Sequence, residues 1–139
     1  MMAVALLSLI TCLAWVPLKD IYSSYTLKAD SRQIARMLKS ARQEAIATGE
    51  PQLVLFYHND NSIKFMGKRY RFSPEVQYAS IPNFTTSVGG VKACRFNPTG
   101  APGSGGVVVL KNRRQEKTYI IVSAVAGRIR ISDQPPDNW

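Results

Sequence analysis

The sequence predicts an α+β fold in which one long N-terminal helix packs on an antiparallel β-sheet or sandwich. Residues 1–18 contain no charged side chain, and residues 20–48 keep the periodicity of a helix. Beyond Pro51 that periodicity gives way to short β-branched and aromatic runs. We therefore expect a transmembrane part of the helix over 1–18, an amphipathic helix over 19–49, and a β-rich globular domain over 50–139.

The N-terminal segment reads MMAVALLSLITCLAWV before Pro17. Sixteen helical residues reach about 24 Å, which is short of the roughly 30 Å hydrocarbon core of a bilayer. We favour a membrane helix whose first residues precede Met1, with Pro17 at a kink or at the exit from the bilayer. A buried core helix is the alternative, and a cleaved signal peptide is disfavoured because no Lys or Arg precedes the apolar run.

The second helical segment has two distinct faces. Its apolar positions recur at helical spacing, and its basic positions recur on another face, which we interpret as solvated. The apolar positions are Leu27, Ile34, Leu38, Ala41 and Ala45, and the basic ones are Arg32, Arg36, Lys39 and Arg42. Gly49 and Pro51 indicate where this helix ends, because glycine favours the left-handed residue after a helix and proline cannot continue it.

The remainder of the chain predicts only strands. Apolar, β-branched or aromatic runs separated by turn residues occur at 52–57, 62–66, 68–72, 76–81, 91–96, 106–110, 118–122 and 128–132. Parallel neighbours would need crossover helices, and no helical pattern is left to supply them. The sheet is therefore expected to be antiparallel, with the amphipathic helix covering one face.

The residue types of the chain give no support to catalysis. With one histidine and two cysteines, the chain has too few ligands for a dense metal site or a disulfide framework. The glycine-rich stretch 100–106 does not match a phosphate-binding loop, because a strand rather than a helix comes after it. We expect no enzyme activity, no cofactor and no metal.

Positive charge is the clearest functional signal outside the helix. The chain has 18 Lys and Arg against nine Asp and Glu, and between Lys92 and Arg130 only Glu116 is acidic. Such a distribution suits a polyanion, and each phosphate contact adds salt-dependent, sequence-independent affinity. Ordinary solubility charge or protection of an edge strand is the alternative. The candidate DNA contacts are Arg113, Arg114 and Lys117 at one predicted hairpin and Arg128 and Arg130 on the last strand.

Three motifs in order resemble those of the GspH/FimT-type minor pseudopilins of bacterial type II secretion and type IV pilus machines. The first is similar to the family's A-R-x-E-A-I signature and comprises Ala41, Arg42, Glu44, Ala45 and Ile46. The second resembles its F-x-P-x-G motif, with Phe96, Pro98 and Gly100. The third matches G-R-x-R, with Gly127, Arg128 and Arg130. The resemblance covers nearly the whole chain and implies a pilin-like fold.

The same resemblance implies a function and a location. Members are structural subunits that wait in the bacterial inner membrane as single-pass proteins, with the globular domain outside the cytoplasm, and then join a pilus or pseudopilus. Other pilins are the expected partners, through the N-terminal helix. Some FimT-like members carry G-R-x-R and take part in DNA uptake, so a DNA-binding minor pilin is the alternative function. Which machine the subunit serves stays open.

The residues of the family's processing site are not among residues 1–139. Pilin-like precursors carry a basic leader, a glycine and then Phe-Thr-Leu-x-Glu, and Met1-Met2-Ala3-Val4 resembles the residues that normally come after that glutamate. We expect a reading frame that starts upstream, where about five more residues would lengthen the apolar helix to about 32 Å. Leader cleavage and N-methylation are implied by the resemblance alone.

Overall fold

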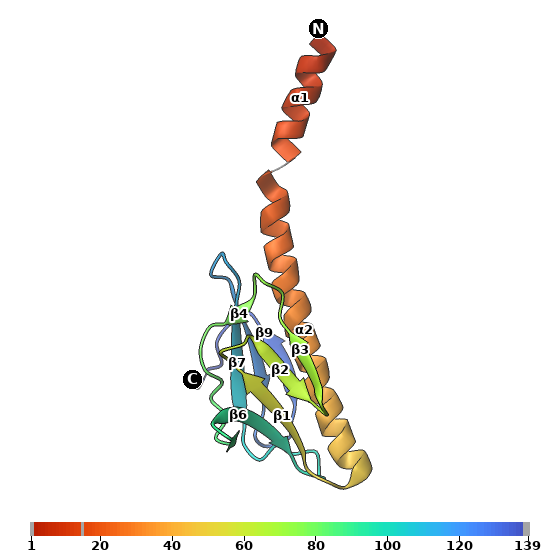
Figure 1. Ribbon diagram of the computed structural model, residues 1–139, viewed down its shortest axis with the longest axis vertical. Coiled ribbons are helices and arrows are strands. Elements are labelled where there is room, and N and C mark those ends of the chain that lie inside the picture. Colours follow the sequence, from red (N-terminus) through yellow and green to blue (C-terminus); the bar gives the residue numbers. More distant parts are fainter. Residues whose placement is uncertain (1, 15, 138–139) are drawn as a thin grey trace.

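A computed structural model describes residues 2–14 and 16–137 of the chain (Figure 1). Two helices lie within the predicted long helix: α1, Met2–Ala14, and α2, Val16–Thr48. Pro17, where the sequence predicts a kink or the exit from the bilayer, is the second residue of α2. In Figure 1, α1 extends beyond the globular part, whereas the lower part of α2 is embedded in it.

The end of α2 agrees with the expected stop signal. Gly49 adopts a left-handed backbone with φ +69° and donates its N–H to the Ala45 carbonyl at 3.1 Å. The adjacent Thr48 hydroxyl donates to the Glu44 carbonyl at 2.7 Å. These contacts satisfy carbonyl groups that a helix end leaves open, and the chain then turns into the first strand.

Nine strands form two antiparallel sheets in the described part of the chain. Sheet A has the order β3-β2-β1-β6-β5, and sheet B has the order β4-β7-β8-β9. The strands are β1 Gln52–Tyr57, β2 Ser62–Phe65, β3 Lys68–Arg71, β4 Gln77–Tyr78, β5 Ser87–Val88, β6 Val91–Phe96, β7 Gly106–Lys111, β8 Lys117–Val122 and β9 Ile129–Ser132. The predicted α+β class and the antiparallel pairing are both confirmed.

Two short strands depart from the prediction. The run predicted over 76–81 forms only the two-residue β4, Gln77–Tyr78; the Ala79 N–H still donates to the Val109 carbonyl, and the chain then leaves the sheet. The two-residue β5, before the turn at Gly89 and Gly90, was not predicted at all. β4 pairs with the distant strand β7, a contact that a local hydrophobic pattern does not encode, whereas β5 pairs locally with β6 across the Gly89-Gly90 turn.

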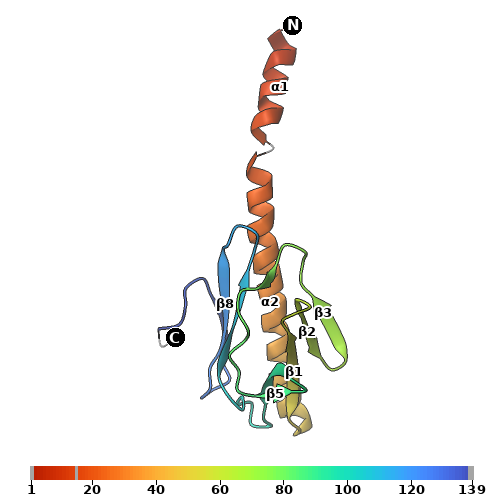
Figure 2. The same ribbon diagram turned by 60° about the vertical axis from the view of Figure 1, so that its left-hand side comes forward.

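The core lies between α2 and the two sheets. Figure 2 shows β8 of sheet B and β2–β3 of sheet A on opposite sides of α2. Every residue of the predicted apolar helix face is buried, and Ile34, Leu38, Ala41 and Ala45 are fully so. Phe56 of β1 stacks on Phe84, with ring centroids 5.1 Å apart.

A buried carboxylate fastens the middle of α2 to sheet A. Asp30 is 1% exposed, and its two oxygens accept a hydrogen bond from the Tyr70 hydroxyl at 2.6 Å and one from the Ser73 N–H at 2.9 Å. Burial, together with this hydrogen bond and the nearby negative charge, raises the pKa of Tyr70 to about 12. These two hydrogen bonds fix the rotation of α2 about its own axis, because both oxygens of its Asp30 side chain accept from residues in or just after β3.

The upper part of the helix carries uncovered apolar side chains. In α1, Val4, Leu6, Leu7, Leu9 and Ile10 are between 63% and 71% exposed. A large contiguous apolar surface of this kind marks a contact with lipid or with another protein. Within 2–14 and 16–137, no helix combines the length and hydrophobicity needed to cross a membrane.

Candidate functional site

The glycine of the F-x-P-x-G motif lies in a tight loop beneath the end of α2. The Asn97 N–H donates to the Ala101 carbonyl and the Gly100 N–H to the Asn97 carbonyl, both at 2.8 Å. Gly100 is buried at φ +87°, and an added Cβ would lie 2.9 Å from Cδ1 of Ile46. Its carbonyl accepts a hydrogen bond from Nε of Arg42 at 3.0 Å.

The glycine of the G-R-x-R motif meets the same carbonyl from the other side. The β8–β9 turn is closed by hydrogen bonds from the Ser123 N–H to the Arg128 carbonyl and from the Gly127 N–H to the Ser123 carbonyl. Gly127 is buried at φ +64°, and a Cβ there would lie 2.3 Å from the Gly100 oxygen and 3.3 Å from Nε of Arg42. We call Arg42, Gly100 and Gly127 the motif junction. One residue from each of the three family motifs meets there.

The remaining motif residues support this junction. Ala41 and Ala45 are fully buried on the face of α2 that meets the sheets, and Phe96 is fully buried at the end of β6. Pro98 is exposed in the loop, and Glu44 is half-buried on α2. The interpretation of Arg42 as part of a solvated stripe is wrong, because its side chain is half-buried and bonded to Gly100.

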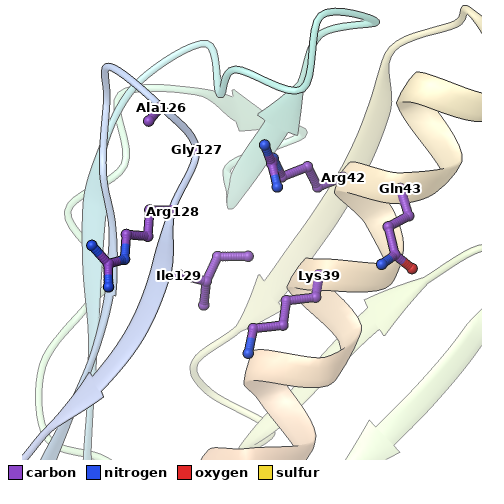
Figure 3. Close-up of a pocket in the computed structure, with 7 residues that line it drawn as sticks. All are labelled: Lys39, Arg42, Gln43, Ala126, Gly127, Arg128 and Ile129. Atoms are coloured by element: carbon purple, nitrogen blue, oxygen red, sulfur yellow. The ribbon is translucent and has the colours of Figure 1, made fainter.

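A basic cleft of about 380 Å³ opens beside the junction (Figure 3). We use this name for the hollow between Lys39, Arg42 and Gln43 of α2 and residues 126–129 of the β8–β9 turn. Three of the seven lining residues are cationic and none is acidic. Figure 3 shows Arg42 reaching toward Gly127, and Ile129 directed toward α2 while Arg128 is directed away from it. The positive charge on the α2 side of the cleft, from Lys39 and Arg42, can attract an anion.

The structure divides the five candidate DNA contacts into two groups. Antiparallel pairing sets Val122 opposite Ile129 and Tyr119 opposite Ser132, so Lys117 and Arg128 lie at opposite ends of the β8–β9 pair. Strand β8 has six residues, so the two ends of the β8–β9 pair lie about 17 Å apart. The two hairpin tips therefore do not lie side by side.

The two groups also differ in their charge partners. Arg114 is held by Asp20 at 3.7 Å and Glu116 at 3.2 Å, whereas Arg113 and Lys117 are exposed. Arg128 and Arg130 are exposed on either side of the buried Ile129, as expected for two residues that face the same way. Neither forms an ion pair with any residue in the described part of the chain. This second group is free to meet an anion.

Lys39 and Gln43 were not singled out as site residues. Lys39 is three residues before Arg42 and four before Gln43, a helical spacing visible in the sequence, but nothing local indicated that the β8–β9 turn would pack against that side of α2. Elsewhere in the described residues, no group of three or more His, Cys, Asp and Glu side chains could hold a metal ion. The buried Cys94 is also unsuited to chemistry, because burial raises the pKa of its thiol to about 12.

A long helix with an uncovered apolar end, embedded below in an antiparallel β-domain, defines a pilin-like subunit. The family model described as Type II transport protein GspH matches residues 30–127, which include all three residues of the motif junction. The chain belongs to this family, and the predicted type of minor pseudopilin is confirmed.

The fold is similar to that of a minor pilin of known structure. The type IV minor pilin FimU of Pseudomonas aeruginosa strain PAO1, in two crystal forms, matches with TM-scores of 0.60 and 0.58. Sequence identity is 13% in both, and the matches cover 80% of this chain and 92% and 98% of those chains. A comparison with curated protein sequences found no match.

Proposed function

We propose that this chain is a structural, non-catalytic subunit that assembles into a type IV pilus or a type II secretion pseudopilus. The observation that carries the proposal is the exposed apolar surface of α1, which extends beyond the folded domain. Before assembly the inner membrane would cover this surface, with the globular domain outside the cytoplasm. In the filament, the helices of neighbouring subunits would cover it instead.

Small side chains on α1 support lateral packing of this helix. Ala3, Ala5 and Ser8 allow close approach of helices, and the Ser8 hydroxyl already donates to the Ala5 carbonyl at 2.8 Å. Ala14 is another small residue of this apolar segment, but its side chain lies outside the part that the structure describes. Close packing without buried unpaired polar groups is what an assembly of apolar helices requires.

A charged residue on α1 tests the proposal. Ala5→Glu should abolish membrane retention and filament incorporation in the host bacterium, measured by fractionation and by immunoblotting of sheared filaments. Ala29→Glu is the matched control, because Ala29 is exposed on the part of α2 beside the domain. Incorporation of Ala5→Glu at the wild-type level would show that α1 is not the assembly contact.

DNA binding is the second candidate function, because Arg128 and Arg130 are exposed and unpaired at the edge strand β9. The basic cleft adds Lys39 and Arg42 on the neighbouring helix. These residues are not arranged to form specific hydrogen bonds with base edges, so binding should be independent of the DNA sequence. Affinity should fall with salt by a log–log slope of about −0.9 per neutralised phosphate.

Shift assays with duplex DNA at low and moderate salt test this second function on the full chain in detergent. Arg128→Ala/Arg130→Ala should weaken binding and reduce the magnitude of the salt slope by about 2. Arg113→Ala/Lys117→Ala, at the far end of sheet B, should have a smaller effect. Equal affinity of wild type and the Arg128/Arg130 variant would exclude the G-R-x-R arginines as DNA contacts, and absence of binding at low salt would leave only the structural function.

A further inference from the structure

A second groove, remote from the motif junction, lies between α2 and the β2–β3 hairpin. Its volume is about 500 Å³, and its apolar lining includes Met37 of α2 and Phe65 and Met66 of the hairpin. Phe65 shares a face of sheet A with the fully buried Ile63 and with its cross-strand partner Lys68. This face is the one that packs on α2. We call this site the hairpin groove.

The hairpin turn holds an exposed methionine against local preference. Met66 and Gly67 have φ +51° and +76°, a two-residue turn with both residues left-handed, where Asn-Gly is the favoured pair. Methionine at such a position costs about 1 kcal/mol, and here its side chain is 63% exposed. Neither folding nor solubility favours this residue, so its apolar side chain beside the groove points to a contact.

The charges around the hairpin groove are all positive. Arg36, Lys68 and Arg69 contribute to its lining, and no acidic residue does. Arg69 is 3.9 Å from Asp60 and lies over the Tyr57 ring at 4.3 Å. Arg36 and Lys68 have no ion-pair partner in the described part of the chain. The complementary occupant is therefore both apolar and acidic, which disfavours a second copy of this chain with its net charge of +9.

The strand that borders the groove has an open side. β3 is at the edge of sheet A and pairs only with β2 among the described residues. Its outer backbone N–H and C=O groups are available to an extended segment, which would add to the sheet as a further strand. Alternate side chains of such a segment would face the groove.

We propose that the hairpin groove receives an extended acidic segment of a neighbouring filament subunit. An apolar side chain of that segment contacts Met37 and Met66, and its carboxylates lie beside Arg36 and Lys68. The lining residues of the hairpin groove indicate that the bound segment is apolar and acidic. That this segment belongs to a filament subunit rests on the proposed assembly function.

Methionine methyl signals provide a direct probe of the groove. The chain has four methionines, of which Met37 and Met66 line the groove and Met1 and Met2 stand at the N-terminus as internal references. The full chain in detergent, labelled with ¹³C at the methionine methyl groups, is titrated with a short peptide in which glutamate and leucine alternate. Signals of Met37 and Met66 should shift. A peptide alternating glutamate and serine should bind at least tenfold more weakly, and equal binding of the two would overturn the proposal.

Met66→Asn separates binding from folding. Asparagine suits the left-handed turn, so this variant should have a higher midpoint of thermal unfolding and yet bind the glutamate–leucine peptide about tenfold more weakly. Val125→Asn is the matched control, because Val125 is 91% exposed in the β8–β9 turn, remote from the hairpin groove. Unchanged affinity of Met66→Asn would refute a role for the groove, since a purely structural methionine would affect only the unfolding midpoint.

Filament incorporation tests the source of the segment. In the host bacterium, Met66→Asn should lower incorporation while Val125→Asn does not. Normal incorporation of Met66→Asn would exclude a filament subunit as the source and leave the assembly function intact. Failure of the wild-type chain to enter filaments would refute the assembly function and with it this source.

Discussion

Replacing Gly127 with alanine should destabilise the fold more than replacing any glycine that only needs a left-handed backbone. The new Cβ would lie 2.3 Å from the Gly100 oxygen, and Cβ atoms essentially never come within 3.0 Å of other heavy atoms. Either the β8–β9 turn or the Gly100 loop must therefore move by most of an ångström. Such a shift breaks the 3.0 Å hydrogen bond from Arg42 to the Gly100 carbonyl.

The expected loss combines two contributions. A non-glycine residue at φ +64° costs about 1–2 kcal/mol. A partly buried hydrogen bond from a charged donor contributes about 1.5–3 kcal/mol. The free energy of unfolding should therefore fall by about 3 kcal/mol or more, which lowers the midpoint of thermal unfolding by on the order of 10 °C for a domain of this size.

Gly89→Ala isolates the backbone contribution. Gly89 has φ +59°, close to that of Gly127, but no heavy atom lies within 4 Å of its added Cβ. Urea unfolding measured by circular dichroism should show a loss of only about 1–2 kcal/mol for Gly89→Ala. Equal losses for the two variants would refute the close contact with Gly100. Arg42→Met and Gly127→Ala should also be non-additive, since both remove the same hydrogen bond, and additive losses would contradict a shared junction.

Three further predictions concern buried polar groups. Asp30→Ala leaves the Tyr70 hydroxyl and the Ser73 N–H without their acceptor, so the free energy of unfolding in urea should fall by about 2–4 kcal/mol. Burial and the Asp30 contact raise the pKa of Tyr70 from 10 to about 12, so its contribution to stability is complete below pH 10 and lost as the pH rises to 12. Burial also raises the pKa of Tyr78, so a phenolate absorbance titration should show two late tyrosines, and Tyr70→Phe should remove the earlier of the two. Burial raises the pKa of Cys94 to about 12, so in a Cys12→Ser background the thiol should resist iodoacetamide at neutral pH until urea unfolds the chain, and rapid reaction in the folded state would contradict its burial.

Local patterns predicted the elements that carry their own hydrophobic signal. The boundaries of Gln52–Tyr57 and Val91–Phe96 match the prediction, because both apolar-rich segments are bounded by turn residues on both sides. Gln77–Tyr78 was predicted too long, since its sheet pairing is with the distant β7, and Ser87–Val88 was missed because a two-residue strand carries too little hydrophobic pattern of its own. Sequence reasoning therefore predicts the core strands better than the edges of the sheets.

The geometry of the motif junction depends on contacts that no single segment encodes. Arg42 and Gly100 are 58 positions apart and Gly127 lies still further along the chain, yet the three residues meet at one carbonyl oxygen. The family resemblance identified all three motifs, but a stripe of basic residues predicts a solvated helix face when the opposing turn is unknown. The length and pairing of β8 likewise decide that Lys117 and Arg128 lie apart.

The junction also explains why a glycine precedes the two arginines. Side chains alternate along β9, and the turn starts the strand with Ile129 toward α2 and with Arg128 and Arg130 exposed. A slip of one residue would reverse this alternation, burying an arginine and exposing the isoleucine. Gly127 allows the turn to pack against the Gly100 carbonyl, and this contact fixes where the alternation begins. Because the glycine sets the position of both arginines, Gly127→Ala should weaken any DNA binding although it removes no charge.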